Sequence, residues 1–174
     1  MPLREILTEP NEILRKKSLP VEKVDGELQR LMNDMLDTMY AAPGIGLAAI
    51  QIGVPKRVIV LDLSSKDEPK NPMCFVNPEI ITKSENQSTY EEGCLSVPGQ
   101  FAEIDRPDKC HIKYLDYNGQ QKEIKAEGMI ATCIQHEMDH LEGILFIDYL
   151  SKLKKTMIVK KLSKQKKELE RIVV

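Results

Sequence analysis

The sequence predicts an α+β fold in which short antiparallel strands pack around a central buried helix, with one helix before the strands and an amphipathic helix at the C-terminus. Five or six short strand-like segments follow one another along the middle of the chain, whereas a parallel sheet would need helices between its strands. Residues 128–143 then repeat apolar side chains at helical spacing with few charges between them, which is typical of a helix buried on most sides. A chain of 174 residues is long enough for one buried domain and short for two, so we expect a single domain over residues 1–174.

The composition is that of a globular protein, with 41% hydrophobic and 30% charged residues. No apolar run approaches the ~18–20 residues that a membrane-spanning helix needs, and the first residues lack the apolar core of a secretion signal. We therefore expect a cytoplasmic protein without membrane contact, whose cysteines are thiols or metal ligands rather than disulfides. Cys74 and Cys110 lie in strand-like runs, where we expect buried thiols, and we assign Cys133 to the core or to a pocket wall.

The N-terminal part of the chain predicts one helix. Residues 1–24 contain three prolines, which indicate extended chain with at most a short helical turn at residues 11–15. Asp25 can cap a helix that follows it and ends before Pro43. The apolar positions of this helix keep the 3.6-residue period; they are Leu28, Leu31, Met32, Met35, Leu36 and Met39. Methionines in such a stripe belong to a core more often than to a binding surface, so we expect them to pack against the body of the protein.

Residues 44–53 form a stretch of glycine and small apolar residues that we expect to be a loop. The stretch lacks the third glycine of a dinucleotide-binding loop and the Gly-Lys-Ser/Thr of a P-loop. Its glycines would let the main chain approach a ligand closely, with Gln51 as the polar side chain among apolar neighbours. A tight turn selected for packing explains the segment equally well.

The strand-like segments come next. We expect strands at residues 58–63, 74–76, 79–82, 109–117 and 120–126. Residues 64–72 predict a polar loop, and Asn77-Pro78 should bend the chain between two of the strands. Asn118-Gly119 is the strongest short signal for a hairpin. Residues 90–99 are unusual, because they set Cys94 behind a glycine, between strand-like pieces and in an acidic setting.

Two histidines and a glutamate lie together on the predicted buried helix, which Gly143 should end with a left-handed cap. His136 and His140 are four residues apart, which places both rings on one face with β-carbons about 5–6 Å apart, close enough to share a cation. Glu137 flanks the same face, where a carboxylate needs a hydrogen bond or a positive charge beside it. This is the HExxH spacing of metal sites in which the glutamate handles the proton. The alternative, histidines that merely fill or cap a core, leaves the glutamate without a role.

A catalytic site of this kind usually has a third protein ligand and leaves one position open for water. A histidine six residues after His140 would continue one HExxH class, but Phe146 stands there. Glu168 and Glu170 are remote and lie in a lysine-rich tail, which makes both poor choices. Cys94 is the best candidate, since a thiolate binds borderline-soft metals well and its glycine-flanked loop can meet the helix face.

The end of the chain is basic. After an apolar connection at residues 144–150, a final helix from about residue 151 carries an apolar stripe of Leu153, Met157, Ile158, Leu162, Leu169 and Ile172. Residues 151–174 contain nine Lys and Arg against two Glu, a balance of +7, so the rest of the chain carries −9. Such a tail suggests contact with a polyanion, although a solvated helix face is the commoner meaning of a run of lysines.

Three segments taken together resemble the three motifs of the bacterial peptide deformylase family: GIGLAAIQ (44–51), EGCLS (92–96) and QHEMDH (135–140). The likeness extends from the first residue to the C-terminal helix. It implies a single catalytic domain and an enzyme that removes the formyl group from the N-terminal formylmethionine of nascent chains. The site residues that it implies are the metal ligands Cys94, His136 and His140, the general base and acid Glu137, and the oxyanion donors Gln51 (side chain) and Leu95 (N–H).

The resemblance also implies a pocket for the methionine side chain and a divalent metal. We expect the pocket lining to include Gly44, Ile45, Gly46, Tyr90, Glu92, Met129, Thr132 and Cys133. Ligand rules alone favour zinc for a Cys-His-His site. The resemblance implies Fe²⁺ in the cell, with Zn²⁺, Ni²⁺ or Co²⁺ as substitutes. Such a cation lowers the pKa of a bound water towards ~7, and Glu137 can take the proton.

The chain departs from the family pattern in two places. Many relatives have arginine where this chain has Phe101, so a charged contact with the substrate backbone is not expected there. Tyr90 and Thr132 make the pocket more polar than the family pattern, which should shift its side-chain preference. Arg106 lies nearby in the sequence, and we hypothesise that it pairs with Glu92 and braces the loop of the third ligand.

Two other functions compete with this interpretation. A zinc peptidase would share the helix, but such enzymes do not use a ligand like Cys94 with it. A metal-stabilised ribosome-binding or RNA-binding module would explain the basic tail, but a purely structural site prefers four closed ligands and has no role for Glu137. An enzyme acting on nascent chains could also dock near the ribosomal exit tunnel through residues 151–174. We expect no specific DNA binding.

Overall fold

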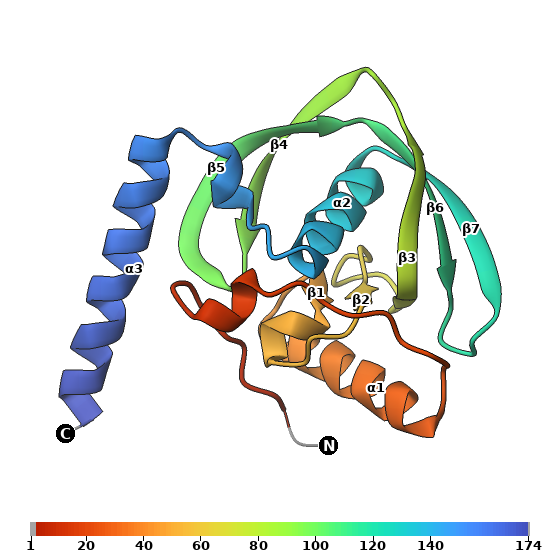
Figure 1. Ribbon diagram of the computed structural model, residues 1–174, viewed down its shortest axis with the longest axis horizontal. Coiled ribbons are helices and arrows are strands. Elements are labelled where there is room, and N and C mark those ends of the chain that lie inside the picture. Colours follow the sequence, from red (N-terminus) through yellow and green to blue (C-terminus); the bar gives the residue numbers. More distant parts are fainter. Residues whose placement is uncertain (1–2, 174) are drawn as a thin grey trace.

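Helix α2 (Met129–Leu141) lies at the centre of the computed structural model, which describes residues 3–173, with side chains described through residue 169. Figure 1 shows the strands arching around α2, with helix α1 (Gly26–Ala41) on the opposite side of strands β1 and β2. This arrangement confirms the predicted α+β class with a central buried helix. In the described part of the chain no helix combines the length and the apolar character that crossing a membrane requires.

All strand pairs within the two sheets are antiparallel. The larger sheet has the order β1-β2-β3-β6-β7, with bounds Gly46–Ala48, Val58–Leu61, Met73–Lys83, Lys109–Leu115 and Gln121–Glu127. The smaller sheet is a hairpin of β4 (Gln87–Cys94) and β5 (Val97–Pro107). The hairpin between β6 and β7 turns at Gly119, whose φ of 79° requires glycine, so the Asn-Gly signal is confirmed.

Helix α1 begins and packs as its sequence predicts. The Asp25 side chain accepts a hydrogen bond from the Leu28 N–H at 2.9 Å, which satisfies one of the free donors of the first turn. Met32, Met35 and Met39 are fully buried and form a core with β1 and β2, so the methionine stripe is core. A second core lies between α2 and the other face of the larger sheet. The short turn predicted at residues 11–15 is the 3₁₀ helix η1 (Glu12–Arg15).

Two predictions about the strands were wrong. Residues 44–53 are not a loop, because they form strand β1 and the 3₁₀ helix η2 (Ala49–Ile52). Small apolar residues carry little strand propensity, and pairing with β2 through Leu47↔Val60 decides the structure. The two short strands expected at residues 74–82 are one strand, β3, with an irregular register at Asn77. Asn77 has a φ of 51° and is held there by hydrogen bonds to both main-chain groups of Val21.

Gly143 ends α2 as predicted. The Ile144 N–H donates to the Asp139 carbonyl at 2.9 Å and the Gly143 N–H to the His140 carbonyl at 3.1 Å, which is the Schellman pattern. Gly143 has a φ of 75°, and a β-carbon there would overlap the main-chain carbonyl of Arg15. Glycine is therefore required at this position by both backbone conformation and space.

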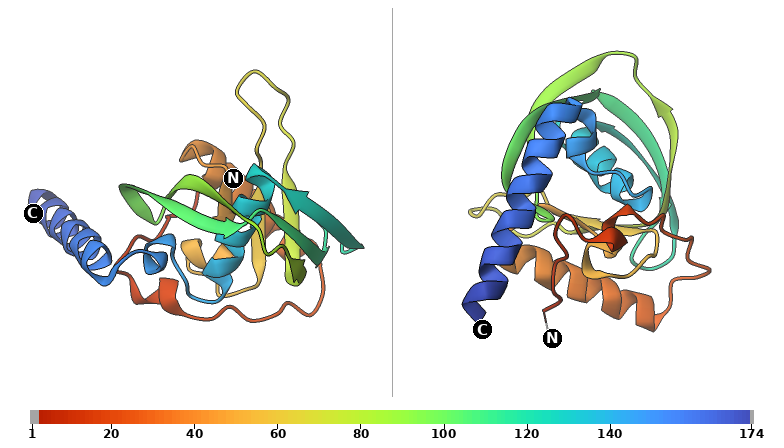
Figure 2. Two further views of the ribbon diagram at one scale, coloured as in Figure 1. Left: turned by 90° about the horizontal axis from the view of Figure 1, so that it is seen from above. Right: turned by 60° about the vertical axis from the view of Figure 1, so that its left-hand side comes forward.

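The C-terminal helix α3 (Lys152–Val173) stands out from the body of the protein (Figure 2). It follows the 3₁₀ helix η3 (Phe146–Tyr149) and packs mainly through Leu162, with Ile158 beside it. Leu153, Met157 and Leu169 are exposed, so the predicted apolar stripe is only partly buried. Ile172 belongs to the stripe as predicted from sequence, but its side chain lies outside the described residues.

Candidate active site

Three side chains of types that can bind a metal meet where the β4–β5 hairpin covers α2. Cys94 comes from the end of β4, where the strand register shifts, and His136 and His140 come from successive turns of α2. The Cys94 Sγ lies 3.4 Å from the His140 Nε2, and the three ligand atoms lie within 4.8 Å of one another. One divalent metal ion can reach all three atoms, and a thiolate with two imidazoles is a donor set that suits such an ion.

His136 is oriented by a carboxylate behind it. Its Nδ1 lies 2.8 Å from the Glu92 Oε1, so the Nε2 is left to face the ligand cluster. Burial lowers the pKa of His136, but its contacts with Cys94 and Glu92 raise that pKa well above its ordinary value. Burial, with the nearby charges of His136 and Arg106, holds the pKa of His140 well below its ordinary value. A metal ion must displace any proton from the ring nitrogen that binds it in each histidine, so the affinity of the site for metal depends on pH.

Glu92 is itself held by a buried ion-pair network. The Arg106 guanidinium donates to both Glu92 carboxylate oxygens, at 2.7 and 3.0 Å, and to Asp139 at 2.8 Å. The predicted pairing of Arg106 with Glu92 is therefore confirmed. Burial raises the pKa of Glu92, but the hydrogen bonds from His136 and Arg106 outweigh that effect and lower it. Sequence reasoning missed Asp139, although an acidic residue on a helix predicted to be buried calls for a partner.

Glu137 is buried next to the ligand cluster. Its Oε1 lies 3.8 Å from the His140 Nε2, and the side chain is 5% exposed. Burial raises the pKa of Glu137 to about 7, although the charges of His136 and Arg106 act in the opposite direction. A β-carbon on Gly46 would lie 2.8 Å from the Glu137 Oε2, so this glycine lets strand β1 run past the carboxylate. A carboxylate with a pKa near neutrality is suited to accept and return a proton.

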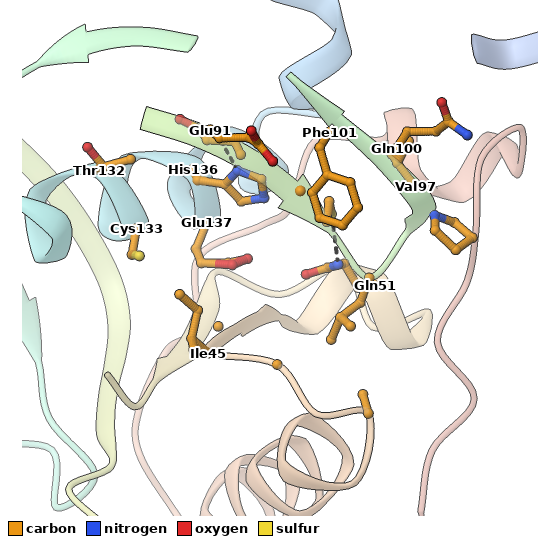
Figure 3. A pocket seen from close by; sticks show the side chains of 18 of the residues that line it. Ile45, Gln51, Glu91, Val97, Gln100, Phe101, Thr132, Cys133, His136 and Glu137 are labelled. Carbon is orange, nitrogen blue, oxygen red and sulfur yellow. Dashed lines mark hydrogen bonds and ion pairs between the residues drawn. The ribbon is translucent and has the colours of Figure 1, made fainter. Parts of the chain in front are cut away.

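Gln51 reaches the same place from the η2 turn. Its Oε1 accepts a hydrogen bond from the Ala48 N–H at 2.9 Å, which fixes the amide so that the NH₂ group points away from η2. The Nε2 donates to the Ser96 Oγ at 3.0 Å and lies 3.5 Å from the Cys94 Sγ. Figure 3 shows the Gln51 amide and the Glu137 carboxylate on neighbouring parts of one cavity. Sequence reasoning gave Ser96 no role, although the residue ends the EGCLS motif.

Leu95, the third predicted catalytic residue, lies in the turn between β4 and β5, directly after Cys94. Its side chain packs on the main chain of Gly44, where a β-carbon would lie 2.7 Å from the Leu95 Cδ1. The absence of a side chain at Gly44 thus lets the β4–β5 turn approach the start of β1.

A cavity of about 610 Å³ opens next to these groups, a size typical of small-molecule and peptide sites. All eight residues predicted for the substrate pocket line it: Gly44, Ile45, Gly46, Tyr90, Glu92, Met129, Thr132 and Cys133. Burial raises the pKa of the Cys133 thiol to about 12, so it stays protonated and forms wall, as predicted. Phe101, which is 66% exposed, also lines the cavity, although it was not among the predicted pocket residues.

Comparisons with known proteins agree on one family. A family model described as polypeptide deformylase matches residues 3–156. The chain is 67% identical to the peptide deformylase of Pelagibacter ubique over 174 residues, which cover 100% of both chains. It is 60% identical to the peptide deformylase of Phenylobacterium zucineum over 167 residues, which cover 96% of this chain and 99% of the relative.

Solved structures give the same result. The crystal structure of peptide deformylase from Ehrlichia chaffeensis superposes with a TM-score of 0.91 at 41% identity, covering 96% of this chain and 98% of the other. A second structure from that organism, in complex with actinonin, superposes with a TM-score of 0.90 at 44% identity, covering 95% and 98%. The chain belongs to the polypeptide deformylase family and is an enzyme of that type.

Proposed function

We propose that this enzyme removes the formyl group from the formylmethionine at the start of newly made proteins, releasing formate and a free amino terminus. The observation that carries the proposal is the convergence of Cys94, His136 and His140 with Glu137 and Gln51 around one cavity. The zinc-peptidase and RNA-binding alternatives are less well supported, since neither accounts for a cysteine ligand beside a buried, proton-handling glutamate.

Glu137 carries the proton in the proposed reaction. Cys94, His136 and His140 would hold a divalent cation, which would supply Lewis-acid activation and lower the pKa of a water molecule bound to it. The Glu137 carboxylate takes a proton from the water that attacks the formyl carbon, and it returns this proton to the departing amine nitrogen. A pKa of about 7 suits both steps, because neither the protonated nor the ionised form is costly near neutral pH.

Gln51 and the Leu95 N–H stabilise the negative charge that develops on the formyl oxygen. The Gln51 amide is 1% exposed and held by Ala48 and Ser96, so it needs little reorganisation when the charge forms. A donor of this kind contributes roughly 2.7–4 kcal/mol to stabilisation of the transition state. Substitution of Gln51 by a residue without the amide should therefore lower kcat with little effect on metal content.

The methionine side chain of the substrate occupies the apolar part of the cavity. Met129 and Ile45, which are 48% and 49% exposed, form its rim, and Cys133 lies deeper. Thr132 also lines the cavity, but its hydroxyl oxygen is buried and has no hydrogen-bond partner within the described residues. This arrangement supports methionine over larger or charged residues.

Fe²⁺ is the proposed metal in the cell, with Zn²⁺, Ni²⁺ or Co²⁺ able to replace it. A thiolate and two imidazoles bind all four ions, so selection depends on availability as well as affinity. Metal analysis of protein purified without oxygen, together with activity after exchange of each ion, tests the proposal. Higher activity with Zn²⁺ than with Fe²⁺ would argue against it.

Residues 1–174 are proposed to form one catalytic domain, with residues 151–174 as its basic helix. The family model ends at residue 156, so most of α3 lies beyond the matched region. We place the enzyme in the cytoplasm and propose that α3 contacts the ribosome through its lysines. Deletion of residues 151–174 should weaken ribosome binding, and binding of the full chain should fall with rising salt. Ribosome binding that salt does not change would contradict an electrostatic contact.

The decisive assay measures formate release from formyl-Met-Ala-Ser by the metal-loaded protein under anaerobic conditions. The intact protein should release formate, whereas Glu137→Ala should be at least about 10²-fold slower while retaining its metal. Absence of release by the intact, metal-loaded protein would refute the proposed function.

A further inference from the structure

A second cavity of about 700 Å³ lies beside the catalytic one, between strand β5 and helix α3. Its apolar side chains are Phe101, Ala102, Leu150, Met157 and Ile158. Phe101 and Met157 are 66% and 63% exposed, so this groove is open to solvent. Exposed apolar side chains gathered in one groove are typical of an interaction site.

Basic side chains border the groove on the α3 side. Lys154 and Lys161 are seven residues apart and share one face of the helix with Met157. Lys155, on a neighbouring face, is tied to a carboxylate of η3 at 2.7 Å. Lys154 and Lys161 form no ion pair within the part of the chain whose side chains are described, and Glu103 is the acidic residue on the opposite wall. The groove therefore carries an excess of positive charge.

The groove adjoins the catalytic cavity. Gln100 and Phe101 line both of them. The Phe101 ring rests against Gly93, where a β-carbon would lie 2.6 Å from the Phe101 Cε1, and Gly93 directly precedes the ligand Cys94. Within the described structure β5 pairs with β4 alone, so its other edge carries main-chain groups that an extended chain can bond to.

We propose that this groove binds the part of the polypeptide substrate that lies beyond the residues held in the catalytic cavity, and that it favours acidic and apolar side chains there. The inference rests on the proposed deformylation of polypeptide amino termini. A substrate whose first residue fills the catalytic cavity leaves it in an extended form across Phe101 and reaches Met157, with Lys154 and Lys161 beside it. The groove thus makes the enzyme sensitive to substrate length and charge, which the catalytic cavity alone does not provide.

The test compares three formylated peptides under anaerobic conditions. They are formyl-Met-Ala-Ser, an acidic extension (formyl-Met-Ala-Ser-Gly-Gly-Leu-Asp-Asp-Leu) and its basic counterpart with Lys-Lys in place of Asp-Asp. For the intact enzyme the acidic peptide should have a KM about two- to tenfold lower than the basic one, the range expected of two exposed ion pairs. The value of kcat should be the same for both, and the difference should shrink as salt is added.

Variants of α3 distinguish peptide binding in the groove from an effect of the overall charge of the protein on KM. Lys154→Glu with Lys161→Glu should reverse the preference between the two long peptides, and Met157→Ser should raise KM for both. The matched control is Lys152→Glu with Lys166→Glu, which makes the same charge change on the opposite side of α3 and should leave the preference unchanged. Turnover of formyl-Met-Ala-Ser should be the same in all variants, which also shows that they fold.

Each outcome decides between distinct claims. Failure of the intact enzyme to release formate from any of the peptides would refute the proposed function itself. Normal turnover with equal KM for the acidic and basic peptides would leave deformylation intact and refute the groove. A KM difference that the control variant reverses equally well would assign the effect to overall charge and would also refute it. Weaker ribosome binding by the Lys154, Lys161 and Met157 variants, with KM for the long peptides unchanged from the intact enzyme, would show that the groove binds the ribosome instead of the substrate. This result would overturn the proposal.

Discussion

Replacement of Arg106 by methionine should destabilise the protein and loosen the metal site. The Arg106 side chain is 4% exposed and makes three hydrogen bonds, two to Glu92 and one to Asp139. Arg106→Met keeps most of the volume but leaves two carboxylates without their shared cation. Removal of one partner from a buried ion pair costs about 3–5 kcal/mol. The loss here should lie towards the lower end of that range, because Glu92 keeps its contact with His136 and Asp139 keeps the Tyr149 hydroxyl.

The effect should depend on pH in a defined direction. The pKa of Glu92 is lowered in the folded protein, so its ionised form contributes stability above its ordinary pKa of about 4.3, and that stability is lost as pH falls through the lower folded value. Burial raises the pKa of Glu92, and without Arg106 fewer interactions oppose this effect. The pKa of Glu92 in the folded protein therefore rises. The difference in unfolding free energy between the intact protein and Arg106→Met should therefore be largest near neutral pH and should shrink in acid.

Urea unfolding followed by circular dichroism measures the stability, and competition with a chelator measures metal affinity. Metal affinity should fall by about 10–100-fold, because Glu92 no longer holds His136 in one orientation. Lys109→Met is the control, since Lys109 pairs with Glu127 and both side chains are exposed, at 66% and 74%, so its loss should cost less than about 1 kcal/mol. Equal costs for the two variants, or a stability loss with unchanged metal affinity, would refute the bracing role of Arg106.

Three further predictions concern the reaction centre. The intact enzyme should lose kcat/KM as pH falls through a value at or below about 7, because Glu137 must be ionised to accept a proton; a pH profile unchanged in Glu137→Gln would contradict this assignment. Gly46→Ala should cost about 1–3 kcal/mol and lower activity more than metal content, since the new methyl group meets both Glu137 and Leu61 at 2.8 Å; wild-type kinetics would show that strand β1 can move away. Metal removal by a chelator should lower the Tm and abolish activity, and the affinity of the protein for the metal should fall as pH falls, because protons compete for His136, whose pKa is raised; a Tm unaffected by the chelator would argue against a folding contribution of the metal.

Most elements of the fold could be predicted because their signals are local. Asp25 before a methionine stripe, Asn118-Gly119 between strand-like runs and Gly143 after the histidines each predicted a boundary that the structure confirms. The strand at residues 46–48 could not be predicted in this way. Its small residues have no pattern of their own, and pairing with β2 decides their conformation.

The metal-ligand candidates also differ in whether a local sequence signal could predict them. His136, Glu137 and His140 share a face of α2 by helical spacing alone, so the sequence predicted them as a unit. Cys94 lies more than forty positions away on another element and was chosen from its chemistry and from family resemblance. The contact of 3.4 Å with His140 depends on how the β4–β5 hairpin closes over the helix.

By itself the sequence determined which groups are available for catalysis and binding. They are a buried HExxH helix, a cysteine in a glycine-flanked turn, a glutamine among apolar neighbours and a basic final helix. Only the tertiary structure decided that Arg106 binds Asp139 in addition to Glu92, that Ser96 and Ala48 orient Gln51, and that a groove leads from Phe101 along α3. The physical reason is that spacing within one element follows from backbone geometry, whereas hydrogen bonds and cavities between elements depend on how their buried faces pack.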